Sequence, residues 1–402
     1  MNKKVKNGFI SMTLVYTFLV LFMFVMLAIL RTYTEKDKFL QAINDQIDSD
    51  IGKASKDRIS IINKIIDLNM PTSDNVFGIK YFKISNSHYN NGNSLFYMDK
   101  LYSDFDLLAH TDENADGHTS RIYYFRGDVE NNHIVFANMC FRIIRTNEDG
   151  SIRLKYNGEY DKNSVNKCPT TSDVAENIAL VSIGYESFSE NTSFNASSFA
   201  NSEVMKKVND WYYSKIVKDK SDNENNPLNR YYTENVSNTA VYCFKNSEEL
   251  KPSFINPLNQ APDDNNIKNN LSLKCENSTD RFILGDTRLY YPVGLLTAQD
   301  VVLAGGYLYQ GDNDLYKGGS FGITNTGYYM YSGGDFWTMS SYGNSGKMLY
   351  VAGGNDNDEK NGALIPDNPN EKHHIIPVIS IGPDISIETG SGLATNPYIV
   401  RK

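Results

Sequence analysis

The chain has 402 residues, of which 40% are hydrophobic and 12% aromatic, which is enough for two or three domains with cores of their own. Its 39 Lys and Arg against 48 Asp and Glu give a net charge of −9. A polyanion such as nucleic acid therefore has no global electrostatic attraction to the chain and is excluded as the expected partner.

The N-terminal segment predicts a membrane helix. The stretch Phe9–Leu30 has no charged residue over 22 positions, and a helix of that length spans a hydrocarbon core of ~30 Å. Lys3, Lys4 and Lys6 precede it, so the positive-inside rule keeps the N-terminus in the cytoplasm and places the rest outside the cell. The run is longer than the apolar region of a signal peptide, which favours a retained helix over a cleaved signal.

The same helix is predicted to continue beyond the membrane. Apolar residues recur by threes and fours as far as Leu68, where Met70-Pro71 breaks the pattern. Phe9 to Leu68 would be one helix of 60 residues, ~90 Å long. The alternative is a membrane helix followed by a separate coiled-coil stalk.

Short strands, turns and two helices are predicted after Pro71. The strands are Arg121–Arg126, His133–Ala137, Phe141–Arg145, Ile152–Tyr156, Asp335–Met339, Met348–Val351 and Ile375–Ile381. Asp149-Gly150 predicts a hairpin turn. The helices are Val204–Ile216, capped by Asn201 or Ser202, and Ala298–Ala304, capped by Thr297. The polar stretch 221–270 is predicted to be mostly loop. This mixture indicates an α+β fold class, with a long N-terminal hydrophobic helix before a β-rich domain.

The four cysteines all follow the apolar run, so they are predicted to lie in an exported region where disulfides persist. Four cysteines allow three pairings. We expect Cys140–Cys168 and Cys243–Cys275, each closing a loop worth about 3–4 kcal/mol in the chain-entropy model. The alternative is two or more free, buried thiols. There is no C-x-x-C, and His373-His374 lack nearby partners in the sequence, so no zinc site is predicted.

Met1–Gly8, with three lysines, followed by Gly8-Phe9 and an apolar helix, resembles the N-terminus of type IV pilin-like proteins and pseudopilins. The resemblance implies processing by a prepilin peptidase between Gly8 and Phe9. Thr13 stands where the family has a Glu that pairs with the new N-terminus of a neighbouring subunit. A minor or tip-type subunit is therefore more compatible than a major filament subunit.

A second set of motifs covers roughly residues 120–402. It consists of Tyr124–Asp128, Val135–Ala137, Phe141–Arg153, Tyr291–Ala298, Phe336–Ser340, Pro377–Ile381 and Gly392–Val400. Together they resemble bacterial surface domains with a C-type-lectin-like fold, of the subgroup similar to formylglycine-generating enzyme. The two resemblances imply a leader (1–8), a helix (9–70), a small connecting β region (71–120) and a C-type-lectin-like surface domain (121–402).

Catalysis is not predicted. Formylglycine-generating enzymes bind copper through two late cysteines, and no cysteine follows Cys275. No histidine lies in a G-x-S-x-G or H-E-x-x-H context. The chain is therefore interpreted as a binding protein without catalytic residues.

The ligand-binding face is predicted within residues 307–358, which hold eight tyrosines among Gly, Ser, Asn and Asp. Such a composition suits a broad recognition surface. The alternative is that these are half-buried sheet tyrosines. The candidate ligand-binding residues are Tyr328, Tyr329, Tyr331, Tyr342, Asn344, Tyr350, Asn355 and Asp356.

A calcium loop is a further candidate. Asp112, Asn114 and Asp116, with Gly117, match the start of an EF-hand loop, but Tyr123 stands where the closing Glu should be. An Asp- and Asn-rich turn without metal is the alternative.

Together these features predict a cell-surface, minor or tip-type pilin-like subunit that presents an extracellular adhesion domain. Its expected partners are the membrane, other pilin-like subunits and an extracellular protein or glycan. The alternatives are a membrane-tethered receptor outside any filament, or an exported enzyme.

Overall fold

The computed structural model describes residues 61–69, 72–73, 95–101, 119–190, 194–218, 227–245, 273–284, 288–306, 308–309, 329–353 and 362–400. All of them belong to one compact unit, Ile59–Lys402. The predicted leader and residues 9–60 of the predicted helix lie outside the described residues.

Ten of the described strands form one sheet centred on β5 (Met139–Thr146). One edge of β5 pairs along its length with β6 (Ile152–Glu159). The other edge pairs first with β4 (His133–Phe136) and then with β3 (Thr119–Phe125). The sheet therefore divides into two branches beyond β5.

Further strands extend both branches and the β6 side. β15 (Val378–Ile381) and β10 (Val293–Gly294) follow β6, both antiparallel. β17 (Tyr398–Val400) pairs in parallel with β4, and β16 (Ile387–Thr389) lies beyond it. β2 (Leu95–Leu101) pairs with β3, and β1 (Thr72–Ser73) pairs in parallel with β2.

Turn chemistry explains the two central hairpins. Ala137 and Asn138, between β4 and β5, both have positive φ, at 51° and 59°, as a two-residue type I′ turn requires. Between β5 and β6, Gly150 has φ of 79°, and the Asp149 carboxylate accepts from the Ser151 amide at 2.9 Å. The predicted Asp149-Gly150 hairpin is therefore confirmed.

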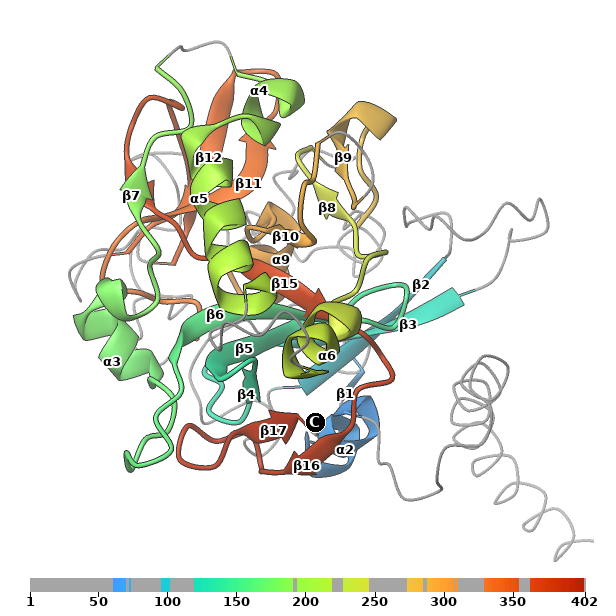
Figure 1. Ribbon diagram of the computed structural model, residues 1–402. Coiled ribbons are helices and arrows are strands. Elements are labelled where there is room, and N and C mark those ends of the chain that lie inside the picture. The colour runs from blue at the N-terminus through green and yellow to red at the C-terminus, as the bar shows by residue number, and fades with distance from the viewer. Residues whose placement is uncertain are drawn as a thin grey trace, which may run out of the picture. The chain divides into compact units, whose positions relative to one another are not determined.

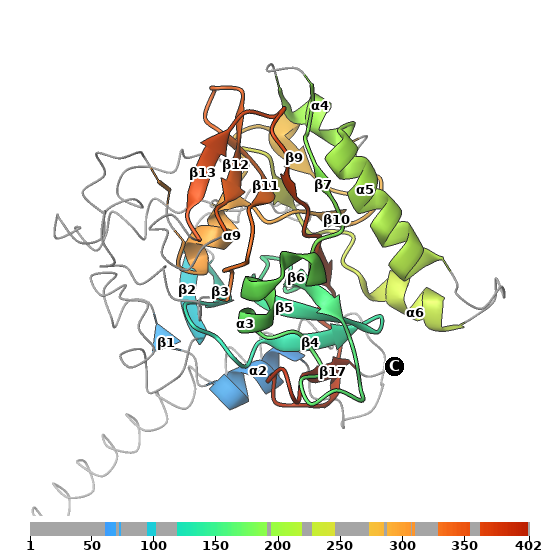
Figure 2. The same cartoon turned by 90° about the vertical axis from the view of Figure 1, so that its left-hand side faces the viewer.

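The second sheet has the order β13 (Leu364–Asp367), β12 (Lys347–Val351), β11 (Phe336–Tyr342), β14 (His373–His374) and β7 (Tyr185–Glu186). β8 (Tyr242–Cys243) and β9 (Arg281–Phe282) form a separate two-stranded ribbon. Figures 1 and 2 show the second sheet on one side of the ten-stranded sheet, with α9 (Ala298–Leu303) between them.

Short helices surround the sheets. They are α2 (Ile61–Asn69), α3 (Thr171–Glu176), η4 (Ile178–Leu180), α4 (Ala196–Ala200), α5 (Glu203–Tyr212), η5 (Tyr213–Val217, a π-helical turn), α6 (Pro227–Asn235) and η6 (Ser278–Asp280). Ser202 caps α5 by accepting from the Met205 amide, and Thr297 with Asp300 forms a capping box on α9. The helix α6 lies within the stretch 221–270 that is predicted to be mostly loop, and much of that stretch lies outside the described residues.

The predicted fold class is wrong. The described residues form mostly β-sheet with short helices, so an α+β chain led by a long apolar helix does not describe them. The described end of the predicted helix is α2, which has nine residues and packs its isoleucines against β2, β3 and β5. No helix among the described residues has the length and apolar character needed to cross a membrane.

The face of the central strands toward the second sheet carries buried charge. Arg145 and Arg153 both bind the Asp300 carboxylate of α9, at 2.8 and 3.0 Å. Burial alone would raise the pKa of Asp300, but Arg153 and then Arg145 outweigh it, so the pKa lies well below its usual range. Lys155, fully buried on β6, places its ammonium 5.8 Å from the ring centroid of Phe336 on β11.

Candidate functional site

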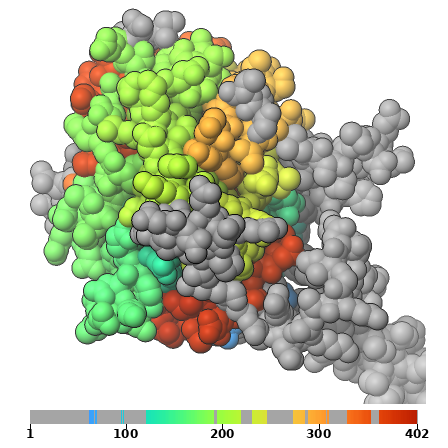
Figure 3. All heavy atoms as spheres, in the orientation of Figure 1, coloured from blue at the N-terminus to red at the C-terminus, as the bar shows by residue number. Residues whose placement is uncertain are grey.

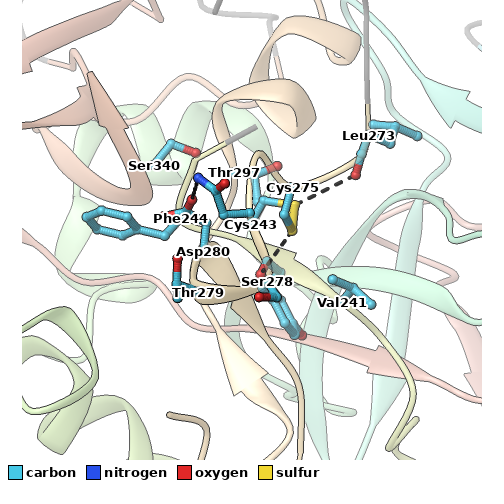
Figure 4. The surroundings of a disulfide bond; sticks show 12 residues. Val241, Cys243, Phe244, Leu273, Cys275, Ser278, Thr279, Asp280, Thr297 and Ser340 are labelled. Atoms are coloured by element: carbon cyan, nitrogen blue, oxygen red, sulfur yellow. Dashed lines mark hydrogen bonds between the residues drawn. A yellow bond between two sulfur atoms is a disulfide. The ribbon is translucent and has the colours of Figure 1, made fainter. Parts of the chain in front are cut away.

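Two disulfides fix segments that are close in sequence. Cys140 of β5 bonds to Cys168, and Cys243 of β8 bonds to Cys275, so the pairing predicted from the sequence is the one found. Both bonds are buried. Figure 4 shows the second disulfide, with Phe244 directed to the opposite side of the strand.

Aromatic packing connects this disulfide ribbon with the second sheet. Phe244 and Phe282 both contact Phe199 of α4, with ring centroids 5.6 and 5.4 Å away. Phe199 contacts Phe188 at 5.1 Å, and Phe188 contacts Trp337 of β11 at 4.7 Å. Because these rings are buried and tightly packed, the ribbon and β11 are held in one core.

A histidine lies at the end of this aromatic chain, on the second sheet. The ring of His373 stacks on Tyr350 with centroids 4.1 Å apart and meets Trp337 edge-on at 4.3 Å. Its Nε2 lies 3.0 Å from the Asp367 carboxylate, and its Nδ1 lies 3.6 Å from the Asp335 carboxylate. Both carboxylates are partly exposed, at 28% and 36%. The His373 ring therefore lies between two carboxylates that also reach solvent.

The neighbouring histidine uses a different set of contacts. His374 Nδ1 lies 2.9 Å from the Ser182 hydroxyl, and the His374 ring lies 5.0 Å from Tyr185, which is 53% exposed. Burial lowers the pKa of His374, opposed by Asp335. The Ser182 hydroxyl donates to the Gly184 carbonyl at 2.8 Å, so the imidazole N–H donates to the serine oxygen. This geometry orders a turn and does not activate a nucleophile.

The half-exposed aromatic and acidic groups of this sheet are suited to binding. Tyr350, Tyr185 and the edge of His374 offer ring surfaces, while Asp335 and Asp367 offer acceptor oxygens. The described residues contain no group of three or more His, Cys, Asp or Glu that could hold a metal ion. The cluster can thus recognise a ligand with apolar faces and hydrogen-bond donors.

The predicted binding tyrosines divide into core and surface residues. Tyr329 and Tyr331 are buried, at 2% and 1% exposure, and the Tyr329 hydroxyl donates to the Phe125 carbonyl. They cannot present their rings to a ligand, so their assignment to the binding face is corrected. Tyr342 and Tyr350 are half-buried, and Asn344 is exposed in the turn between β11 and β12.

The other predicted site residues lie outside the described residues. These are Gly8 and Phe9 of the processing site, Asp112, Asn114 and Asp116 of the calcium loop, and Tyr328, Asn355 and Asp356 of the binding face. They stay predictions.

His373, Asp335 and Asp367 were not predicted as site residues. The His373-His374 pair is visible in the sequence, but its partners come from β7, β12 and the strand ends of β11 and β13. Only the pairing of those strands brings them together, so no local spacing indicated the cluster.

Comparison with protein-family models, with curated proteins and with solved structures finds no match to this chain.

Proposed function

We propose that this protein is an exported, membrane-attached cell-surface protein that binds an extracellular protein or glycan through its second sheet. The observation that carries the proposal is the cluster of partly exposed Tyr350, Asp335 and Asp367 around the buried ring of His373. Aromatic rings with a polar edge and few rotors provide large contact area at low entropic cost. The partly exposed carboxylates add directional acceptors.

The two disulfides support export. Both bonds are buried in the described core, and such bonds persist in oxidising compartments. The uncharged stretch Phe9–Leu30 is the proposed membrane attachment. Processing at Gly8-Phe9, which would favour a pilin-like subunit over a simple tether, is tested by the mature N-terminus. A chain starting at Phe9 supports processing, and a surface-exposed chain that retains Met1–Gly8 contradicts it.

The binding face is tested with the full chain in detergent, screened on a glycan array and a panel of extracellular-matrix proteins. For any ligand found, Tyr350→Ala and Tyr342→Ala are each expected to weaken binding about tenfold or more, because a buried contact aromatic contributes upward of 1–2 kcal/mol. Val165→Ala serves as control, since Val165 is 84% exposed on a different surface loop. Unchanged affinity in both tyrosine variants, with unchanged melting temperature, would refute this placement.

A further inference from the structure

A second group of aromatic side chains lies on the surface, away from the strands of the second sheet. Tyr290 is 75% exposed and Tyr213 is 47% exposed. Tyr291 stacks on Tyr213 and on the buried Tyr212, with centroids 6.4 and 5.2 Å apart. The Tyr290 ring stands nearly perpendicular to Tyr291 at 4.7 Å. Exposed, clustered rings of this kind mark interaction surfaces.

Two chain segments build this tyrosine patch, which we define as Tyr213, Tyr290 and Tyr291. Tyr213 begins the π-helical turn η5, and the other two precede β10. Figure 3 shows the orange segment before β10 at the surface beside the yellow-green atoms of α5 and η5. Single π-helical turns within helices are frequent at functional sites because they redirect side chains.

The carboxylate of Asp210 lies on the same helix as Tyr213. Asp210 is exposed and lies three residues before Tyr213 on the same helical face. After burial and the neighbouring tyrosines, its charge is a further cause of the raised pKa of Tyr291. Asp210 has no ion pair with any described residue, whereas the basic residues of α5 and η5 are all paired. Those pairs are Lys206–Glu203, Lys207–Glu186 and Lys215–Glu159.

Elsewhere the same chain repeatedly places arginine over tyrosine. Arg121 lies 4.1 Å from the Tyr97 ring centroid, and Arg153 lies 4.5 Å from that of Tyr242. No described residue supplies such a cation to the tyrosine patch. Arg288, close by in sequence, instead donates to the Ser278 and Thr279 carbonyls and lies over Phe282.

We propose that the tyrosine patch and Asp210 form a binding site for an arginine side chain of a partner protein. A guanidinium can stack on a tyrosine face and donate to a carboxylate at once. A quaternary ammonium has no N–H for Asp210, and a neutral sugar has no charge to match it. The net charge of −9 further attracts a basic segment over distance.

The test uses the full chain in detergent and a fluorescent hexa-arginine peptide, followed by fluorescence anisotropy at physiological salt. Tyr290→Ala and Asp210→Asn are each expected to weaken binding about three- to fivefold, the range of an exposed cation–π contact. Glu203→Gln removes the same charge from the same helix outside the patch and is expected to stay within twofold of wild type. Tyr290→Phe, which keeps the ring, should retain most of the affinity.

Three results would overturn the proposal. Equal losses in Asp210→Asn and Glu203→Gln would show general electrostatic attraction only. Unchanged binding in Tyr290→Ala would exclude the patch. Binding of cellohexaose or choline that requires Tyr290 but not Asp210, with no such dependence for hexa-arginine, would assign the patch to a different ligand. Tyr350→Ala should leave hexa-arginine binding intact, so this proposal and the one for the second sheet succeed or fail separately.

Discussion

Replacing Lys155 with methionine is expected to stabilise the fold at neutral pH, although it removes a charged residue from a central strand. Lys155 is fully buried on β6, and its ammonium has no hydrogen-bond partner among the described residues. Burial, and then repulsion from Arg142 on the neighbouring strand, lowers the pKa of Lys155 to about 7. A methionine has similar length and no charge to desolvate.

The magnitude follows from proton linkage. The pKa falls from 10.5 in the unfolded chain to about 7 in the folded protein, so the unfolded state binds more protons between these values. Stability therefore rises with pH across this window. One pKa unit corresponds to about 1.36 kcal/mol. The cost of burying Lys155, relative to an uncharged side chain, is therefore about 4 kcal/mol at pH 7 and about 2 kcal/mol at pH 9.

Urea unfolding at pH 7 and pH 9 measures both values, with the buried tryptophans Trp211 and Trp337 as fluorescent probes. Lys155→Met should gain stability at pH 7 and lose about half of that gain at pH 9. Lys206→Met, at a lysine whose side chain is 61% exposed, is the control and should change little at either pH. A Lys155→Met protein less stable than wild type at pH 7, or a gain independent of pH, would refute the reasoning.

Three further predictions concern an ion cluster, a disulfide and a histidine. Asp300→Asn should cost about 3–5 kcal/mol in the same assay, because it leaves two buried arginines without a counter-charge; a loss below 1 kcal/mol would contradict this ion cluster. Because the pKa of Asp300 is lowered in the folded protein, its contribution to folding stability is present at pH values above the ordinary pKa of an aspartate. That contribution is lost as the pH falls below this ordinary pKa toward the lowered one. Replacing Cys140 and Cys168 together with serine should lower the free energy of unfolding by about 3–4 kcal/mol, and an unchanged urea midpoint would be incompatible with the disulfide found here. The pKa of His374 is lowered in the folded protein, so its contribution to stability should be full above pH 6.5 and decline below it. His374→Gln should flatten this decline in melting temperature between pH 7 and pH 5. An unaltered slope would assign the decline to other groups.

Local features of the fold could be predicted from the sequence. The β5–β6 hairpin follows from Asp149-Gly150, and the start of α9 follows from Thr297, because turns and caps depend on residues a few positions apart. Ser202, one of two predicted caps for α5, is the one found. Each disulfide joins cysteines about 30 residues apart, so the shortest-loop pairing sufficed to predict it.

Features that depend on how the two sheets and the helices pack against each other could not be predicted from the sequence. The central strands alternate polar and apolar residues, which is typical of a sheet with one solvated face. In this structure both faces are covered, so Arg142, Arg153 and Lys155 are buried although their positions indicate exposure. Tyr329 and Tyr331 became core residues for the same reason. A composition rich in tyrosine indicates binding only where no second layer covers the rings.

The helix α9 connects this charged layer with the proposed binding face. Asp300 binds Arg145 and Arg153 on the ten-stranded sheet, while the Ala298 amide donates to the Ser340 hydroxyl of β11 at 2.9 Å. Just before the helix, the Leu296 carbonyl accepts a hydrogen bond from the backbone amide of Met339 on β11 at 2.8 Å. A buried ion cluster contributes little net stability compared with apolar packing, but removing one partner leaves the others as uncompensated buried charges. The α9 segment is therefore bonded both to the ten-stranded sheet, through Asp300, and to β11 of the second sheet, through Ala298 and Leu296.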